Sequence, residues 1–448
     1  MKKSILVTLL LFMGILNAQE KKESYSFTLN QAIEHALKNN YKIINAGRDI
    51  ESAINKRWEI TASGLPQINA GLDYNKNFAF TQQGVSGNAF NPGGDPNAVS
   101  TIAFGTKNSM NARASLSQLI FDGTYIVALQ ASKTYLQFYK NSKLKTDNDI
   151  REIVINYYGN VLVTEESITI LEKNKATLEK NVFEAKEIYK NGLIEEESVE
   201  QLEITLASVN SSLNNVTRLI DISKNLLKIT LGLDIEDQLL LTEKLDDLTI
   251  RNLDLAATKE EFNVIDNIDY KIAENFKEQR RLEYKSQIST ALPTLSANFN
   301  FGYNAFSNTF SFLEQQQAWN NFSNMGISLN LPVFSSFGRK AKNQQTKIAF
   351  EQAQTQLTEA EQMLKLQYQT AKSDYEYSIE QYITSKSNLK LAERIENKQQ
   401  IKFKEGLSTS FEFSEAQRQL YTTQQNYLQS MIDVINKKTA LDKVTNTK

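Results

Sequence analysis

The chain has 448 residues, a formal net charge of −2 at pH 7 and no cysteine. The balanced charge argues against a nucleic-acid partner, and the missing cysteine excludes disulfides, thiolate catalysis, zinc–thiolate sites and an acylated cysteine anchor. Because His35 is the single histidine, few of the usual catalytic or metal-binding arrangements are available, and we expect no enzymatic activity, no cofactor and no metal.

The N-terminus has the pattern of a secretory signal peptide. Lys2 and Lys3 precede a mostly apolar run from Ile5 to Leu16, and the small residue Ala18 follows. We therefore predict a signal peptide over residues 1–18 and an exported mature chain. No later segment approaches 18 consecutive apolar residues, so we expect any membrane span to consist of strands.

Long helices are predicted by apolar residues at alternating steps of four and three. No proline lies between Pro96 and Pro293 or after Pro332, which leaves room for such helices. Heptad seams of this kind indicate helices that pack by supercoiling. They run over residues 150–189 and 202–227, and a thinner one with steps of seven runs over 413–441.

Four segments have the two-residue period of strands instead, with apolar residues alternating with Asn, Ser and Gly. They begin near Ile68, Met110, Leu295 and Met325. An apolar face with many aromatic residues and a small, polar face are typical of transmembrane strands, although a soluble sheet with one wet face shares the alternation. Export and strand length favour the membrane. We expect two hairpins, closed by exposed external loops over residues 81–107 and 307–321.

Four strands are too few to close a membrane barrel, since the smallest has about eight. An open sheet edge in hydrocarbon leaves backbone groups unpaired, so the strands must be pooled across chains. Two copies give a barrel of eight strands filled by side chains, and three give twelve strands with a wider lumen.

The chain also repeats itself. Leu65-Pro66 and Leu292-Pro293 each open a strand, and the turn at Gly192-Leu193 returns at Gly406-Leu407. The predicted division is a first repeat over 19–231 (helix 28–63, strands 65–80 and 108–123, long helices 124–190 and 193–231), an acidic, irregular connector over 232–262, and a second repeat over 263–448 (helix 263–291, strands 292–306 and 322–334, long helices 338–404 and 409–445).

Residues 27–40, the two Leu-Pro strand starts and the doubled Gly-Leu turn together resemble the TolC-like outer-membrane efflux proteins, also called outer membrane factors. The resemblance covers essentially the whole mature chain. Tyr41 departs from it, standing where the family often has Pro, and so does the first turn, where residues 195–198 lack the usual Asp.

The resemblance implies a mixed membrane α/β fold. It would be a homotrimer with a twelve-stranded transmembrane β-barrel, four strands per chain, that continues into a long periplasmic α-helical coiled-coil barrel with the connector in an equatorial belt. It also implies a place in the outer membrane of a Gram-negative bacterium, in contact with its lipid. The implied function is the passive channel of a tripartite efflux or type I secretion system, docked onto a periplasmic adaptor (membrane fusion protein) and an inner-membrane pump.

Two groups of residues are candidate sites. Gly192, Leu193, Gly406, Leu407 and Ser408 lie at the turns between long helices, where Gly suits a helix C-terminus for structural reasons alone; the resemblance implies that these tips dock onto the adaptor.

Glu412 and Glu415 follow the second turn at i, i+3 and resemble acidic positions that narrow the periplasmic entrance. Their alternative role is that of helix-start acids, because Thr409 with Glu412 fits a capping box. His35 is interpreted as an ordinary helix-face residue.

Two other functions are alternatives to the passive channel. A structural or adaptor-like periplasmic coiled coil does not need two strand pairs with a lipid-type face. An uptake porin is nearly all strand and does not need helices over more than half the chain.

Overall fold

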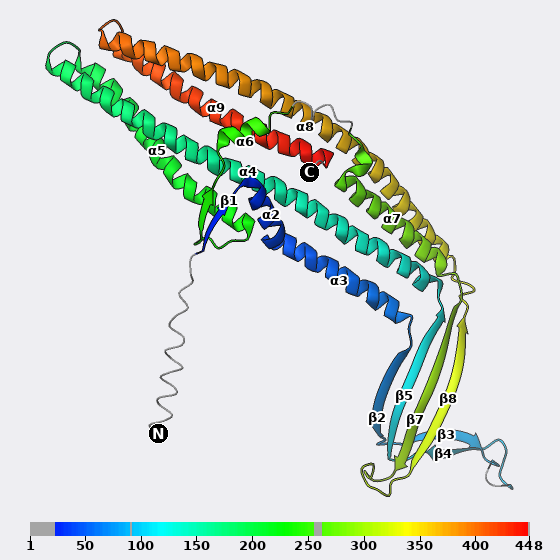
Figure 1. Ribbon diagram of the computed structural model, residues 1–448. Helices are drawn as coiled ribbons and strands as arrows, with labels where there is room; N and C mark the ends of the chain where they lie inside the picture. The colour runs from blue at the N-terminus through cyan, green and yellow to red at the C-terminus, as the bar shows by residue number, and fades with distance from the viewer. Residues whose placement is uncertain (1–22, 90–91, 255–261, 447–448) are drawn as a thin grey trace, which may run out of the picture. The chain divides into compact units, whose positions relative to one another are not determined.

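The computed structural model describes residues 23–89, 92–254 and 262–446 (Figure 1). The predicted signal peptide, residues 1–18, lies outside them. The chain divides into two compact units. The sheet unit comprises Ile50–Phe138 and Asn275–Thr355, and the helical unit comprises the described residues up to Asp49, Tyr139–Glu274 and those from Gln356 onward.

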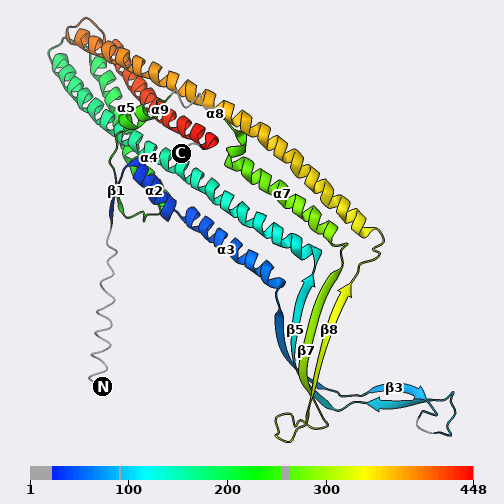
Figure 2. The same ribbon diagram turned by 45° about the vertical axis from the view of Figure 1, so that its right-hand side comes forward.

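The sheet unit is built on a four-stranded antiparallel sheet with the strand order β2-β5-β7-β8 (Figures 1 and 2). The strands are β2 (Gln67–Lys76), β5 (Asn108–Phe121), β7 (Thr294–Ser307) and β8 (Trp319–Asn330). Both predicted hairpins are confirmed, because β2 pairs with β5 and β7 with β8. The pairing of β5 with β7 joins the hairpins and leaves β2 and β8 as the edges.

The two faces of this sheet differ as the alternation predicts. Leu72 and Ile327 on the apolar face are each 66% exposed, although both are large aliphatic side chains. On the polar face Asn300 Nδ2 donates to Asn324 Oδ1 at 2.9 Å, across neighbouring strands. An apolar face left this open needs an apolar environment or a partner.

The prediction that residues 81–107 form only an exposed loop is wrong. This segment contains a separate hairpin of β3 (Thr81–Ser86) and β4 (Val99–Phe104). Its glycines and prolines hid the strands from sequence reasoning, because Pro92 and Pro96 lie in the connection between them. The other loop is shorter than expected, since β8 begins at Trp319.

Four helices contribute residues to both units: α3 (Tyr41–Ser63), α4 (Gly123–Lys190), α7 (Ile268–Ser289) and α8 (Gly338–Lys404). Asp122 begins α4 after β5, because its Oδ1 accepts hydrogen bonds from the backbone N–H groups of Thr124, at 2.7 Å, and Tyr125, at 3.2 Å. Gln118 Nε2 donates to the Gly64 carbonyl at 2.8 Å, which ties β5 to the chain after α3.

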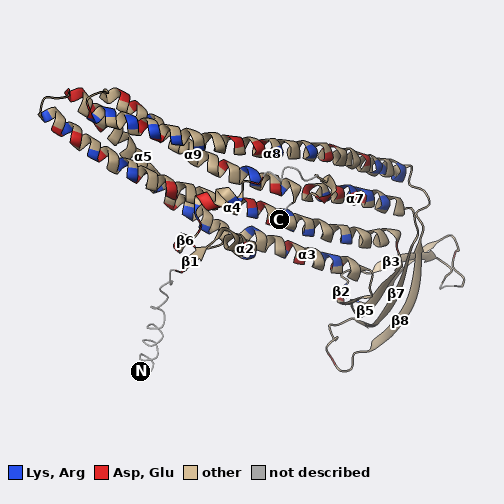
Figure 3. Ribbon diagram, turned by 45° about the horizontal axis from the view of Figure 1, so that its top comes forward, with Lys and Arg blue, Asp and Glu red and all other residues tan. Residues whose placement is uncertain are grey.

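The helical unit adds α2 (Leu29–Asn39), α5 (Glu196–Leu231) and α9 (Ser410–Thr445), with a short 3-10 helix η2 (Val264–Asp266). Tyr158, Leu227, Tyr375 and Ile435 are fully buried in its main core, so helices from both halves of the chain share one hydrophobic interior. Charges of both signs occur along the helices in Figure 3. Within the described ranges, none of the helices has an apolar stretch sufficient to span a bilayer.

The predicted connector over 232–262, of which 255–261 lie outside the described residues, contains regular elements that its acidic sequence did not predict. It holds β6 (Gln238–Leu241), which pairs in parallel with β1 (Ser24–Phe27), and α6 (Leu245–Arg251). Apolar residues of both elements join the main core: Leu239, Leu241, Leu245 and Leu248. The prediction of an irregular segment is therefore wrong for these elements. In α6 the acidic Asp246 and Asp247 occupy the exposed positions between the buried Leu245 and Leu248, so the acidic sequence is compatible with a helix packed on the core.

The single helix predicted over 28–63 is also wrong, because it is divided at Asn40 into α2 and α3. Asn40 has an extended backbone with ψ 133°. Its buried side chain donates from Nδ2 to the Thr230 carbonyl at 2.7 Å, and its Oδ1 accepts from the Lys42 backbone N–H at 2.8 Å. The amide thus caps the new helix and links the break to the end of α5.

Candidate functional site

The turns between α4 and α5 and between α8 and α9 lie at the same end of the helical unit (Figures 1 and 2). In the first turn Gly192 has φ 70°, a left-handed conformation that costs Gly little. Its N–H donates to the Tyr189 carbonyl at 2.8 Å, and the Leu193 N–H donates to the Ile188 carbonyl at 3.2 Å. These two bonds form a Schellman motif, which satisfies carbonyls left open at the helix end.

The second turn repeats this geometry. Gly406 has φ 71° and donates to the Phe403 carbonyl at 3.1 Å, while Leu407 N–H donates to the Lys402 carbonyl at 2.7 Å. Leu193 is 75% exposed and Leu407 is 77% exposed. Each tip therefore carries a leucine side chain that its own chain leaves in solvent.

Side chains from all four helices hold the tips together. The rings of Phe403 and Phe413 stack with centroids 5.3 Å apart, next to the buried Val182 and Leu202. An ion pair between α8 and α4 joins Lys404 Nζ to Glu184 Oε2 at 2.9 Å, and another between α4 and α5 joins Lys186 to Glu203 at 2.6 Å. The exposed leucines thus rest on a packed support.

The capping box predicted at the start of α9 is confirmed. Thr409 Oγ1 accepts from the Glu412 N–H at 3.2 Å, and Glu412 Oε2 accepts from the Thr409 N–H at 3.0 Å. Ser408 Oγ lies 2.9 Å from the same carboxylate oxygen. These hydrogen bonds, the one from the Thr409 backbone first, lower the pKa of Glu412 below its ordinary value. At the first tip the N-cap Glu195 makes no side-chain capping bond.

Glu415 has a partner that sequence reasoning missed. The guanidinium of Arg418, three residues later on α9, binds both of its carboxylate oxygens at 2.6 Å. The i, i+3 spacing of acid and base is the signal that points to this pair. Both acids of the predicted entrance gate, Glu412 and Glu415, are thus engaged with groups of their own helix in the single chain.

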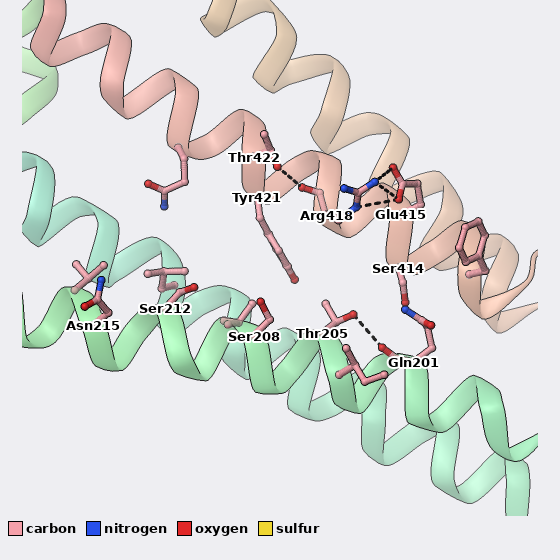
Figure 4. A pocket seen from close by; sticks show the side chains of 16 residues that line it. Gln201, Thr205, Ser208, Ser212, Asn215, Ser414, Glu415, Arg418, Tyr421 and Thr422 are labelled. Carbon is pink, nitrogen blue, oxygen red and sulfur yellow. Dashed lines mark hydrogen bonds and ion pairs between the residues drawn. The ribbon is translucent and has the colours of Figure 1, made fainter.

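A groove of about 570 Å³ lies between α5 and α9, with Leu171 of α4 also in its lining (Figure 4). Burial, followed by the charge of Glu396, raises the pKa of the Tyr421 hydroxyl at this groove. Sequence reasoning missed the groove, although its signal was present beside the apolar seam of α5: a polar series at steps of four and three, namely Gln201, Thr205, Ser208, Ser212 and Asn215.

His35 lies on α2, and its Nδ1 is 3.1 Å from the Leu231 carbonyl. Its ring also packs against Phe27, with centroids 5.1 Å apart. These contacts agree with its interpretation as an ordinary helix-face residue. Across the part of the chain that the structure describes, no three His, Asp or Glu side chains are grouped to hold a metal ion.

Comparison with known proteins gives one sequence match and several structural ones. Residues 273–447 match the sequence model of the family described as Outer membrane efflux protein. No curated protein sequence matches the chain.

The structural matches extend over nearly the whole chain. The outer membrane protein VceC of Vibrio cholerae superposes with a TM-score of 0.70 at 16% identity, covering 93% of this chain and 95% of VceC. The Campylobacter jejuni outer membrane channel CmeC gives 0.72 at 17% identity, covering 96% and 90% of the two chains. The open state of the Neisseria gonorrhoeae channel MtrE gives 0.65 at 16% identity, covering 93% and 88%. The fold is therefore that of these outer-membrane proteins.

Proposed function

We propose that this chain forms a passive outer-membrane exit duct for efflux or secretion, because residues 273–447 match the model of the family described as Outer membrane efflux protein. Substrates would enter from the periplasm and leave the cell without any chemistry at the channel. The observation that carries this proposal is the sheet β2-β5-β7-β8, with two open edges and two chemically different faces.

Closure of the sheet calls for several copies of the chain. A membrane sheet with free edges leaves backbone N–H and C=O groups unpaired, at a cost of several kcal/mol each. Consecutive strands of the sheet run antiparallel, so β8 of one copy and β2 of the next also run antiparallel when placed side by side. Three copies give a twelve-stranded barrel with Asn and Ser lining its lumen, as in the homotrimer that the family resemblance implies.

The long helices would continue this barrel into the periplasm as an α-helical coiled-coil tunnel. In this proposal the chain consists of two repeats, over 19–231 and 263–448, after removal of residues 1–18. The connector over 232–262 would lie in an equatorial belt around the tunnel. The mature protein would occupy the outer membrane of a Gram-negative bacterium, with lipid against the apolar face of the sheet.

The tips would dock onto a periplasmic adaptor that is linked to an inner-membrane pump. Gly192 and Gly406 shape the turns, and Leu193 and Leu407 supply exposed apolar contacts. Ser408 would serve by holding the carboxylate of the capping box.

Glu412 and Glu415 would line the periplasmic entrance as rings of acidic charge. Since Arg418 offsets Glu415, Glu412 would carry most of the effective charge of this gate.

The proposal is tested by cell fractionation and by native size determination in mild detergent. We expect the mature protein in the outer-membrane fraction, as a trimer. A water-soluble periplasmic monomer would contradict the duct and favour a coiled-coil structural protein.

A further inference from the structure

The polar face of the sheet carries an unusual pair of charges. Within the four strands, all of whose residues the structure describes, the charged residues are Asp73 and Lys76 on β2 and Arg113 on β5. Figure 3 shows the sheet largely free of charged residues. Asp73 and Arg113 share the face of Asn and Ser, whereas the alternation puts Lys76 on the opposite, apolar face.

Two glycines flank Arg113 in the sheet. In the register of the sheet it stands between Gly71 on β2 and Gly302 on β7. A Cβ added at Gly71 would lie 3.7 Å from Arg113 Nε, so the side chain leans over this glycine toward β2. At Gly302 the space is covered by the ring of Phe322, the next residue in the row.

The guanidinium of Arg113 makes one long ion pair within its own chain. Arg113 Nη2 lies 3.4 Å from Asp73 Oδ2, longer than the about 2.7–2.9 Å of a strong charge-assisted hydrogen bond. The side chains of Arg113 and Asp73 are 58% and 50% exposed. Among the residues that the structure describes, the guanidinium of Arg113 has no hydrogen-bond partner and only the ion pair with Asp73, although it has five N–H donors in a fixed fork. It is therefore open to an anion from the solvent side.

We propose that Arg113 and Asp73 form a charge-selective site on the lumen wall, where the Arg113 guanidinium binds carboxylate or phosphate groups of passing solutes. This inference rests on the proposed function, because the polar face becomes a lumen only when the barrel closes. Three copies would place three such sites around the lumen face of the barrel, which carries no other charged residue of the four strands. Asp73 limits the field of Arg113, so that anions are held briefly and released.

The test is single-channel recording of the purified trimer in planar bilayers. Reversal potentials under a KCl gradient report charge preference, and pyrophosphate added on the side of the barrel loops probes anion binding. In Arg113→Gln, Asp73 is the remaining charged residue of the four strands on the polar face. Selectivity should therefore shift toward cations, and block by pyrophosphate should weaken by about tenfold. Asp73→Asn should shift selectivity in the opposite direction, toward anions.

Two further variants separate a lumen site from a general charge or folding effect. Lys76→Gln removes the same charge from the other face and should change neither selectivity nor block. Arg113→Lys keeps the charge but loses the planar fork, so the reversal potential should stay near that of the wild type while the block weakens.

The outcomes distinguish the inference from the function beneath it. If the wild-type trimer conducts and both Arg113→Gln and Asp73→Asn keep its selectivity and its block by pyrophosphate, the charge-selective site is contradicted. The proposed exit duct is then unaffected. A wild-type protein that forms no channel would overturn both.

Discussion

Replacing the exposed leucines of both tips, Leu193→Asp and Leu407→Asp together, should abolish transport while the trimer and its barrel stay intact. Both side chains are about three-quarters exposed in the chain. Their loss should therefore change the free energy of unfolding by no more than about 0.5 kcal/mol, as for other surface substitutions.

The effect on docking should be much larger. Burying a whole Leu side chain contributes about 2 kcal/mol, and three-quarters of that is still available at each tip, or about 3 kcal/mol for the two together. This amounts to about a 150-fold loss of affinity per chain. Desolvation of the new carboxylates adds to the loss.

The assay is accumulation of a fluorescent dye in cells that lack the native gene and express the variant. Photocrosslinking from position 407, compared with and without Leu193→Asp, reports the adaptor contact directly. Leu313→Asp is the matched control, because Leu313 is 87% exposed in the β7–β8 loop of the sheet unit. Undiminished efflux in a normally assembled double mutant, together with undiminished crosslinking from position 407 in the presence of Leu193→Asp, would refute the docking role of the tips.

Three further predictions concern the tips and the gate. Gly406→Ala should lower the free energy of unfolding by about 1 kcal/mol, because φ is 71° at this position. Gly47→Ala, inside α3 with open space around it, should instead raise the free energy of unfolding by about 0.5–1 kcal/mol. Urea midpoints of the two variants compare these effects, and equal shifts would contradict the left-handed cap. Because the pKa of Glu412 is lowered, its contribution to stability is present above the pKa of the unfolded state and is lost as the pH falls through the pKa of the folded state. On acidification below about pH 4, the urea midpoint of Glu412→Gln should therefore fall less than that of the wild type. Equal pH dependence of the two midpoints would count against the capping bond. The double variant Glu412→Gln with Glu415→Gln should lose cation preference and block by divalent cations in single-channel recordings. Glu412→Gln alone should give most of this loss, because Arg418 offsets the charge of Glu415. Unchanged selectivity in the double variant would leave both acids as helix-start residues.

The features that local sequence patterns could predict are those that local physics determines. The alternation around Leu72 and Ile327 reflects two faces of one sheet, and the Gly406-Leu407 turn and the Thr409–Glu412 box satisfy backbone groups within a few residues. These interactions need no knowledge of the rest of the fold.

The features that were missed depend on distant partners. The break at Asn40 is fixed by a bond to Thr230, 190 residues away, which a local helical pattern does not reveal. The strand β6 exists because β1, more than 200 residues earlier, pairs with it. The groove between α5 and α9 likewise needs the polar series of α5 to face residues of α9 that are about 200 positions away in the sequence.

The central claim, a barrel closed between copies, is tested most directly by disulfide crosslinking of β2 to β8. The chain has no cysteine of its own, so introduced pairs act alone. Asn69→Cys on β2 would be combined in turn with Asn320→Cys, Asn324→Cys or Ser328→Cys, which lie on the same face of β8. The account predicts that oxidation in outer membranes converts at least one pair into a covalent trimer, whereas the single-cysteine variants form none. Protein that reaches the outer membrane but yields no covalent trimer from any pair would contradict closure through these edges.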